Sequence, residues 1–436
     1  MKRRHLYLHL AAWSLGFALS LPTMAGGPAI SSSSPPPSHG DKTDPTEIVE
    51  YAVERGDDRA LYQLFRTSND PATHALAAMA LERVHWNLDK SSEDARLCEK
   101  VLSKSQPDVA LYCADFAAGN LRLAGKAQEA SREDLAIAQR YAGHADAQYV
   151  ATLKNFAQVS LELPDMHATR PEQTVELPLA RIFGRDGPYI DIKANGHTAR
   201  FLLDTGAGTL LIDDQTANAW GVHFDPGQQQ YTRGYLAKKI PVRTGWIDQL
   251  DLGHGLVADH VPVEVESRAP LLIGFDVLRQ FGAFRLSPDR LVVYGSEDRA
   301  RPTCEDPLLI MSDSHGRYTR WVTGISVGGE VQPTLVDSGA SFYFNGNAAA
   351  LAHYKNTLTG SIGVLDASSR EQRTGIKVVT QQLVISGQAM KMSFIVTTDD
   401  NLASPYTLGN LALKDMDFYA DFDTRHGCML MHTRLH

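Results

Sequence analysis

The chain has few cysteines, no zinc-peptidase histidine pair and no basic run beyond its N-terminus, and each absence excludes a class of protein. Four cysteines occur in 436 residues, and their spacing fits no zinc site. The sixteen histidines include no H-E-x-x-H pair, so metal-dependent proteolysis is not indicated. The formal net charge is −9. Without a basic block, this charge gives little support to nucleic-acid binding.

The N-terminus also lacks the long apolar run of a membrane-spanning helix and has the pattern of a signal peptide instead. Met1–His5 is basic, and residues 6–21 are mainly apolar but interrupted by polar residues. This run is shorter than the ~20 residues that a span needs. Thr23-Met24-Ala25 places small residues at positions −3 and −1 of a cleavage site. We predict a signal peptide over residues 1–25 and a periplasmic or secreted protein. An uncleaved membrane anchor is the alternative, and no cysteine follows the cleavage site to favour a lipoprotein.

Composition then changes twice before residue 170. Residues 26–46 are rich in Ser, Pro and Gly, which is typical of a flexible linker. Residues 47–165 have apolar side chains three and four positions apart, which predicts helices. Asp70-Pro71 and Gln106-Pro107 have the residues of helix starts. Their spacing resembles that of tetratricopeptide-type repeats, with a small helical bundle as the alternative. This region is predicted either to dock a protein partner or to cover an active site.

Two short acidic segments further along share their sequence surroundings. Phe201-Leu202-Leu203-Asp204-Thr205-Gly206 has a second version in Thr334-Leu335-Val336-Asp337-Ser338-Gly339. A glycine that ends a hairpin-turn dipeptide, Asn-Gly or Gly-Gly, stands eight residues before each aspartate. An apolar pair followed by glycine, ending at Gly274 and at Gly409, lies about 70 residues after each aspartate. The same unit of turn, strand, acid and glycine element therefore occurs twice.

These segments resemble the catalytic loops of the aspartic peptidases, and the chain resembles a retropepsin-like lobe present twice in one polypeptide, as in the pepsin-like enzymes. The resemblance covers roughly residues 180–436. It implies a mainly β fold with two barrel-like lobes related by a pseudo-twofold axis, at 177–298 and 299–436, after the α-helical domain. Since both lobes belong to one chain, a monomer would hold a complete site.

The resemblance also implies the site residues. Asp204 and Asp337 would be the catalytic dyad. Four further residues would support the two loops, either as hydroxyls that cross-brace them or as tight turns: Thr205, Gly206, Ser338 and Gly339. In this family a hairpin between the first aspartate and Gly274 folds over the substrate. The candidate here is the stretch that contains Tyr231, Gly234 and Tyr235, with a weaker candidate in lobe two around residues 366–371. An ordinary exposed hairpin tip is the alternative for the first candidate.

The chemistry of a paired carboxylate site follows from the residues alone. Two carboxylates a few ångströms apart do not easily ionise together, so they share one proton over a range of pH. One then acts as a base on water while the other polarises a peptide carbonyl. Such hydrolysis needs no metal, cofactor or covalent intermediate. Two Asx-type turns without catalytic duty are the alternative, but turn chemistry would not require the matched surroundings.

Exported cysteines are more often paired than catalytic, and four allow three connectivities. We predict Cys98 with Cys113 in the helical region and Cys304 with Cys428 in lobe two. One competing motif, Gly324-Ile325-Ser326-Val327-Gly328, matches the G-x-S-x-G elbow of serine hydrolases, but it lies in a predicted hairpin with no long helix after it. The sequence therefore predicts an exported aspartic endopeptidase acting on peptides or proteins. The alternative is a catalytically silent scaffold of the same fold that binds peptides.

Overall fold

The computed structural model describes residues 44–161, 164–182, 185–225, 230–232, 240–298, 302–304, 306–354, 358–365, 371–397 and 404–432. The predicted signal peptide, and the predicted linker up to residue 43, lie outside these ranges. No helix in the described ranges is long and apolar enough to cross a membrane.

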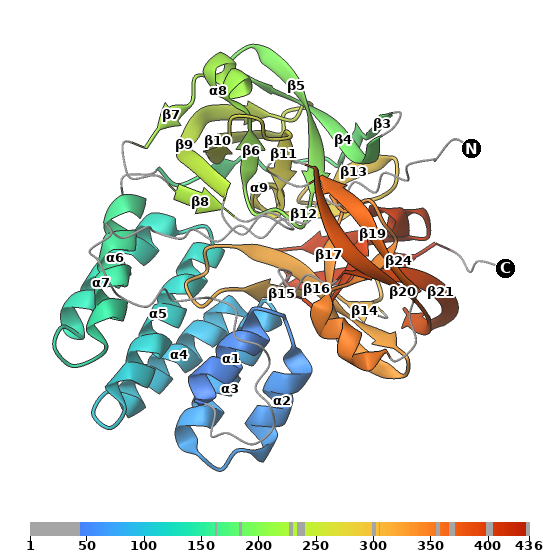
Figure 1. Cartoon of the computed structure of the whole chain (residues 1–436). Coiled ribbons are helices and arrows are strands. Elements are labelled where there is room, and N and C mark those ends of the chain that lie inside the picture. Colours follow the sequence, from blue (N-terminus) through green and yellow to red (C-terminus); the bar gives the residue numbers. More distant parts are fainter. Residues whose placement is uncertain are drawn as a thin grey trace.

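The N-terminal part is a set of helices that pack against their neighbours in sequence (Figure 1). Their bounds are α1 Pro45–Val53, α2 Asp58–Thr67, α3 Pro71–Val84, α4 Leu88–Leu102, α5 Pro107–Leu123, α6 Ala127–Arg140 and α7 Ala147–Ser160. The two proline starts predicted from sequence are confirmed, since α3 begins at Pro71 and α5 at Pro107. Asp70 caps α3 by accepting a hydrogen bond from the Thr73 N–H at 2.9 Å.

Lobe one is a ten-stranded sheet in which β9 pairs with β10 as well as with β4 and β7, so that the sheet closes on itself. Its lateral order is β1 (His167–Ala168), β10 (Val257–Val265), β6 (Leu210–Ile212), β11 (Leu272–Gly274), β5 (His197–Asp204), β4 (Arg185–Ala194), β9 (Ile240–Asp251) and β7 (His223–Phe224). Two short strands pair at its side, β3 (Ala180–Ile182) with β4 and β8 (Gln230–Thr232) with β9. Short helices follow β6 and β11, namely α8 (Asp214–Trp220), α9 (Phe275–Leu278) and η1 (Arg279–Phe281).

Lobe two is an eight-stranded sheet that repeats the central part of this order. Its strands are β15 (Leu309–Ser312), β16 (Thr319–Val327), β17 (Glu330–Asp337), β22 (Tyr406–Gly409), β18 (Phe344–Gly346), β21 (Gln388–Thr397), β20 (Glu371–Ile385) and β19 (Leu358–Leu365). The 3-10 helices η2 (Ala348–His353) and η3 (Asn410–Lys414) follow β18 and β22. The G-x-S-x-G motif lies on β16 and its turn, without the strand-to-helix turn that a nucleophile elbow requires.

A third, six-stranded sheet joins the two lobes. Its order is β14 (Asp306–Pro307), β24 (His426–Met431), β23 (Met416–Asp421), β12 (Ala283–Leu286), β13 (Arg290–Val293) and β2 (Val175–Pro178). The antiparallel pair β12–β23 is the junction between strands of lobe one and strands of lobe two. One apolar core runs through both lobes. The fold is therefore mainly β and two-lobed, with an α-helical region before it, as the sequence predicted (Figure 1).

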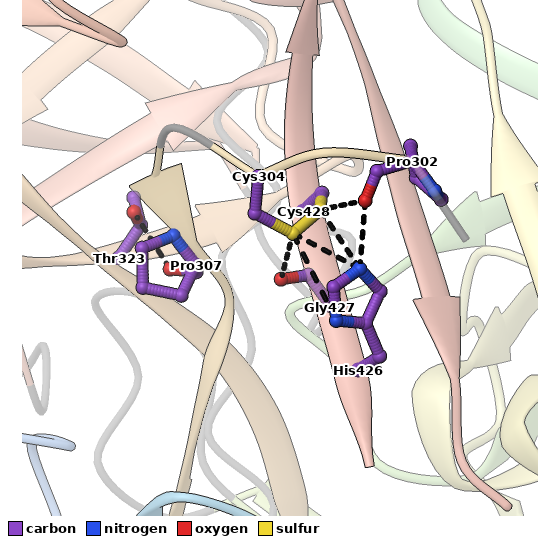
Figure 2. The surroundings of a disulfide bond; sticks show 7 residues. All are labelled: Pro302, Cys304, Pro307, Thr323, His426, Gly427 and Cys428. Atoms are coloured by element: carbon purple, nitrogen blue, oxygen red, sulfur yellow. Dashed lines mark hydrogen bonds between the residues drawn. A yellow bond between two sulfur atoms is a disulfide. The ribbon is translucent and has the colours of Figure 1, made fainter. Parts of the chain in front are cut away.

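Both predicted disulfides are present. Cys98 on α4 bonds to Cys113 on α5, with 5.9 Å between the Cα atoms. Cys304 bonds to Cys428 on β24, with 5.2 Å between the Cα atoms. Figure 2 shows the imidazole of His426 against this second bond, with its Nε2 atom 3.0 Å from the carbonyl oxygen of Pro302. The Cys304–Cys428 bond therefore joins two parts of the chain: the segment between the lobes, which contains Cys304, and strand β24, which contains Cys428.

The helices are attached to lobe two through the turn of the β15–β16 hairpin, which reaches into the helical region (Figure 1). Arg83 of α3 is fully buried. Its Nη1 donates to the carbonyl oxygens of Asp313 at 2.8 Å and Ser314 at 3.0 Å. At the same turn, His315 forms an ion pair with the buried Asp115 of α5, at 2.8 Å between Nδ1 and Oδ2. Polar groups that leave water here are thus matched across the contact.

Apolar side chains are also exchanged between the helices and the β part. Trp86 and Leu123, from the helical region, belong to the core of the lobes, whereas Leu309 of β15 belongs to the core of the helices. The ring of Trp86 lies 4.5 Å from that of Phe422, centroid to centroid. The helical region is therefore packed onto the lobes as part of one folded body rather than attached by a bare linker.

Candidate active site

The two acidic segments lie at the ends of equivalent strands. Asp204 is the last residue of β5, beside Gly274 of the parallel strand β11. Asp337 is the last residue of β17, beside Gly409 of the parallel strand β22. In each lobe a short antiparallel strand, β6 or β18, follows the acidic loop and pairs with the glycine strand. The sequence spacing between acid and glycine thus corresponds to a direct pairing of strands.

The hairpins that lead into these strands have the predicted turns. Asn195 and Gly196 have φ values of 46° and 78°. Gly328 and Gly329 have φ values of 63° and 96°. Positive φ at both central residues is the geometry for which Asn-Gly and Gly-Gly are favoured. Each turn fixes the register of its hairpin. The register in turn determines where the aspartate at the end of β5 or β17 lies.

Reciprocal hydrogen bonds lock the two acidic loops together. The hydroxyl of Thr205 donates to the Val336 carbonyl at 2.9 Å and accepts from the Ser338 N–H at 3.0 Å. The hydroxyl of Ser338 donates to the Leu203 carbonyl at 2.8 Å and accepts from the Thr205 N–H at 3.0 Å. All four groups are buried. Each loop is therefore held in place by the other lobe.

Each aspartate is oriented by its own loop. Oδ1 of Asp204 accepts hydrogen bonds from the N–H groups of Gly206 at 2.9 Å and Ala207 at 3.2 Å. Oδ1 of Asp337 accepts from Gly339 at 2.9 Å and Ala340 at 3.1 Å. The Oδ2 atoms are buried and accept no hydrogen bond from a backbone or hydroxyl group in the described ranges. One oxygen of each carboxyl is thus held by its own loop, and the other is not.

The glycines place each loop against the carboxyl of the opposite lobe. A Cβ atom added to Gly206 would lie 2.5 to 2.8 Å from the three carboxyl atoms of Asp337. A Cβ atom added to Gly339 would meet the carboxyl of Asp204 in the same way. Only a residue without a side chain fits at such a separation. The two carboxyls consequently lie side by side between the lobes.

Burial and proximity shift both acids in the same direction. Burial raises the pKa of Asp204 to about 6, although hydrogen bonds from Asp337 and from two loop N–H groups oppose the shift. Burial raises the pKa of Asp337 well above its ordinary range, and the neighbouring Asp204 raises it further. A pair that resists a second ionisation in this way retains one proton around neutral pH.

A buried arginine next to the pair was not found by sequence reasoning. β16 pairs Val322 with Leu335 of β17, so the antiparallel register places Arg320 beside Asp337. Arg320 is 1% exposed and lies 4.7 Å from the centre of the Tyr318 ring. Its charge lowers the pKa of Asp204. No motif marks this residue, because its position depends on strand register rather than on neighbours in sequence.

The flap candidates are only partly described. Tyr231 lies on β8, opposite Pro241 of β9, which is consistent with a hairpin over lobe one. Gly234 and Tyr235 lie outside the described ranges. So do residues 366–370 of the second candidate, and Glu371 begins β20.

One group of potential metal ligands occurs in the described part of the chain, and it lies away from the aspartates. Cys304, His426 and Cys428 have donor atoms within 4.8 Å of one another. Both sulfurs are bonded to each other (Figure 2), so neither is available as the thiolate that a metal would require.

Part of the chain matches a known protein family. The family described as gag-polyprotein putative aspartyl protease matches residues 190–280. No curated protein matches the chain. An aspartic proteinase from Irpex lacteus aligns with 11% identity and a TM-score of 0.39, over 60% of this chain and 98% of that one. A retropepsin-like aspartic protease from Rickettsia conorii aligns with 23% identity and a TM-score of 0.23, over 30% of this chain and 96% of that one.

The family match covers Asp204 and Gly274 but stops before lobe two. The strand pairing around Asp337 and Gly409 repeats that around Asp204 and Gly274. Residues 190–280 thus match the aspartyl protease family, and the chain has the aspartic-protease fold with both lobes in one polypeptide.

Proposed function

We propose that this protein is an aspartic endopeptidase in which Asp204 and Asp337 share one proton and activate water. The observation that carries the proposal is the reciprocal bracing of the two loops, which holds two buried carboxyls side by side. Bracing of this kind fixes the geometry before substrate arrives, so little reorganisation is needed during the reaction.

Both pKa values are raised, and that of Asp337 is raised partly by the neighbouring Asp204, so the pair holds one proton between the two acids. In our proposal Asp204 is the carboxylate and takes a proton from water, while the protonated Asp337 donates a hydrogen bond to the peptide carbonyl oxygen. Water attacks the carbonyl carbon, and the developing oxyanion is stabilised by the proton of Asp337. When the tetrahedral intermediate collapses, Asp204 gives the proton taken from water to the leaving nitrogen, the carbonyl re-forms and returns the other proton to Asp337, and the peptide C–N bond breaks.

Thr205, Ser338, Gly206 and Gly339 support this dyad without touching the substrate in the described geometry. The hydroxyls satisfy buried backbone groups across the two loops, and the glycines allow the close approach of each loop to the opposite carboxyl. Tyr231 is the described flap candidate for contact with an extended peptide.

We further propose export to the periplasm or outside the cell. Two disulfides support this location, because such bonds persist in oxidising compartments. The N-terminal sequence, with a basic start and a small-residue cleavage site, supplies the corresponding signal.

The test is digestion of a denatured protein and of a peptide library by the purified mature chain from pH 4 to 9. Asp204→Asn and Asp337→Asn are each expected to lower the rate by roughly 10²–10⁴-fold. Asp191→Asn is the matched control, because Asp191 is an exposed acid on the β4–β5 hairpin, paired with Arg200. Cleavage that persists in both dyad variants would refute the mechanism. A wild type that binds peptides without cutting them would support the scaffold alternative.

A further inference from the structure

A second buried acid in lobe one has no part in the dyad. Glu264 on β10 is 3% exposed. Its Oε2 atom is buried, and no hydrogen bond or basic partner for it occurs in the part of the chain that the structure describes. A buried carboxyl with one oxygen left unpaired is unfavourable for folding. Its presence therefore calls for a reason other than stability.

Strand register places Glu264 at the end of an apolar row that begins beside the dyad. Residues paired across neighbouring strands point to the same face of a sheet. Going across the sheet from β10, the paired residues are Glu264, Leu211, Leu272, Leu202 and Tyr189. Asp204 follows Leu202 by two residues on β5, so its side chain points to the same face. Three strand spacings separate Leu202 from Glu264, which is about 14 Å.

The apolar members of this row do not belong to the main core. Tyr189, Leu202, Leu211 and Leu272 form a separate cluster with Ala207 of the acidic loop and Ile240 of β9. Ile240 pairs with Thr232 at the end of β8. The cluster thus lies between the catalytic loop and the strands that carry the flap candidate. The row leads from the strand of Asp204, over aliphatic side chains, to the carboxyl of Glu264.

Lobe two has the equivalent row without the acid. Its paired residues are Ile395, Asn345, Thr407, Leu335 and Val322. Ile395 occupies the position of Glu264, since each is paired in parallel with the short strand after the acidic loop. The fold therefore does not require an acid at this position, and Glu264 distinguishes the two lobes.

We propose that Glu264 determines substrate specificity by binding the ammonium or guanidinium group of a lysine or arginine in the peptide, close to the scissile bond. The inference rests on the proposed peptidase function and names its substrate class. Lysine and arginine have long aliphatic stems that cover apolar surface while the charged end reaches a polar partner. The apolar row could contact such an aliphatic stem, and the carboxyl of Glu264 at its end could contact the charged group.

The protonation of Glu264 makes this recognition depend on pH. Burial raises the pKa of Glu264 to about 8, and the hydroxyl of Thr232 opposes the shift. No charged side chain of the described residues contributes. The free site is therefore mostly protonated at neutral pH. A bound cation stabilises the carboxylate and releases this proton, so the preference for a cationic side chain increases as pH rises.

The test compares peptides that differ in one residue, lysine or norleucine, at each position within three residues of a cleaved bond. Norleucine keeps the aliphatic stem and lacks the ammonium group. The wild type is expected to show at least tenfold higher kcat/KM for lysine at one position. Glu264→Gln is expected to abolish this ratio. Asp259→Asn is the matched control, because it removes the same charge from a half-buried position on the same strand.

Binding separates the failure of this proposal from the failure of the proposed function. The dissociation constants of the two peptides are measured for Asp204→Asn, with and without Glu264→Gln, at pH 6 and pH 8.5. Tighter binding of the lysine peptide at pH 8.5, lost with Glu264→Gln, supports the inference even if the wild type cuts nothing. Equal binding of both peptides, or a lysine preference that survives Glu264→Gln, overturns it even if the wild type is an active peptidase.

Discussion

Replacing Thr205 by valine tests the bracing of the two loops most directly. Valine has nearly the same shape as threonine but lacks the hydroxyl. The change removes the bond to the Val336 carbonyl and the bond from the Ser338 N–H, both within a buried contact between lobes. Leaving a buried polar group unpaired costs about 1–3 kcal/mol. We therefore expect Thr205→Val to lower the free energy of unfolding by roughly 2–6 kcal/mol.

The same substitution is expected to lower kcat, because the two carboxyls are positioned by the loops that the hydroxyl joins. Urea titration followed by tryptophan fluorescence gives the stability, and peptide hydrolysis gives the rate. Thr205→Ser keeps the hydroxyl but removes the methyl group, so it measures how much packing at this position contributes to stability. A Thr205→Val protein within about 0.5 kcal/mol of the wild type, a change typical of neutral surface substitutions, would refute the bracing argument. Equal loss in Thr205→Ser would assign the effect to packing instead.

Two further predictions concern pH and the helical region. In the proposed mechanism Asp204 must be ionised to act as the base, and its pKa is raised to about 6, so kcat/KM should rise as pH increases through about 6. Arg320→Met should move this rise to higher pH, because the charge of Arg320 lowers the pKa of Asp204. A folded variant in which the rise stays at the wild-type pH would contradict this effect. Trp86→Ala should destabilise the protein by about 3–5 kcal/mol, because Trp86 is buried against Phe422 and Phe275. If the variant's lobes unfold at the same temperature as those of the wild type, the helices are independent of the lobes.

The sequence was informative wherever a local pattern has a local structural cause. The turns before Asp204 and Asp337 were predictable because positive φ favours glycine and asparagine. The starts of α3 and α5 were predictable because proline is favoured in the first helical turn. The pairing of the four cysteines followed from assigning each pair to one part of the chain, and the structure confirms it.

Residues that act through strand register could not be found in this way. Arg320 precedes Asp337 by seventeen positions and becomes its neighbour only because β16 folds back on β17. Glu264 meets the apolar row through three successive strand pairings. The insertion of the β15–β16 turn into the helical region depends on Arg83, a residue that looks like an ordinary solvated helix arginine in the sequence. Each role depends on a pairing between distant segments, which no motif records.

The two lobes share backbone geometry around the two aspartates but differ in a charged side chain placed near them. The register of β4 and β5, which pairs Tyr189 with Leu202, puts Gly187 at the lobe-one position equivalent to Arg320. Gly187 has φ 144°, and a Cβ atom there would collide with the side chain of Leu202. Lobe one thus has a glycine where lobe two has this arginine. The charge of Arg320, which lowers the pKa of Asp204, therefore comes from lobe two and has no counterpart at the equivalent position of lobe one.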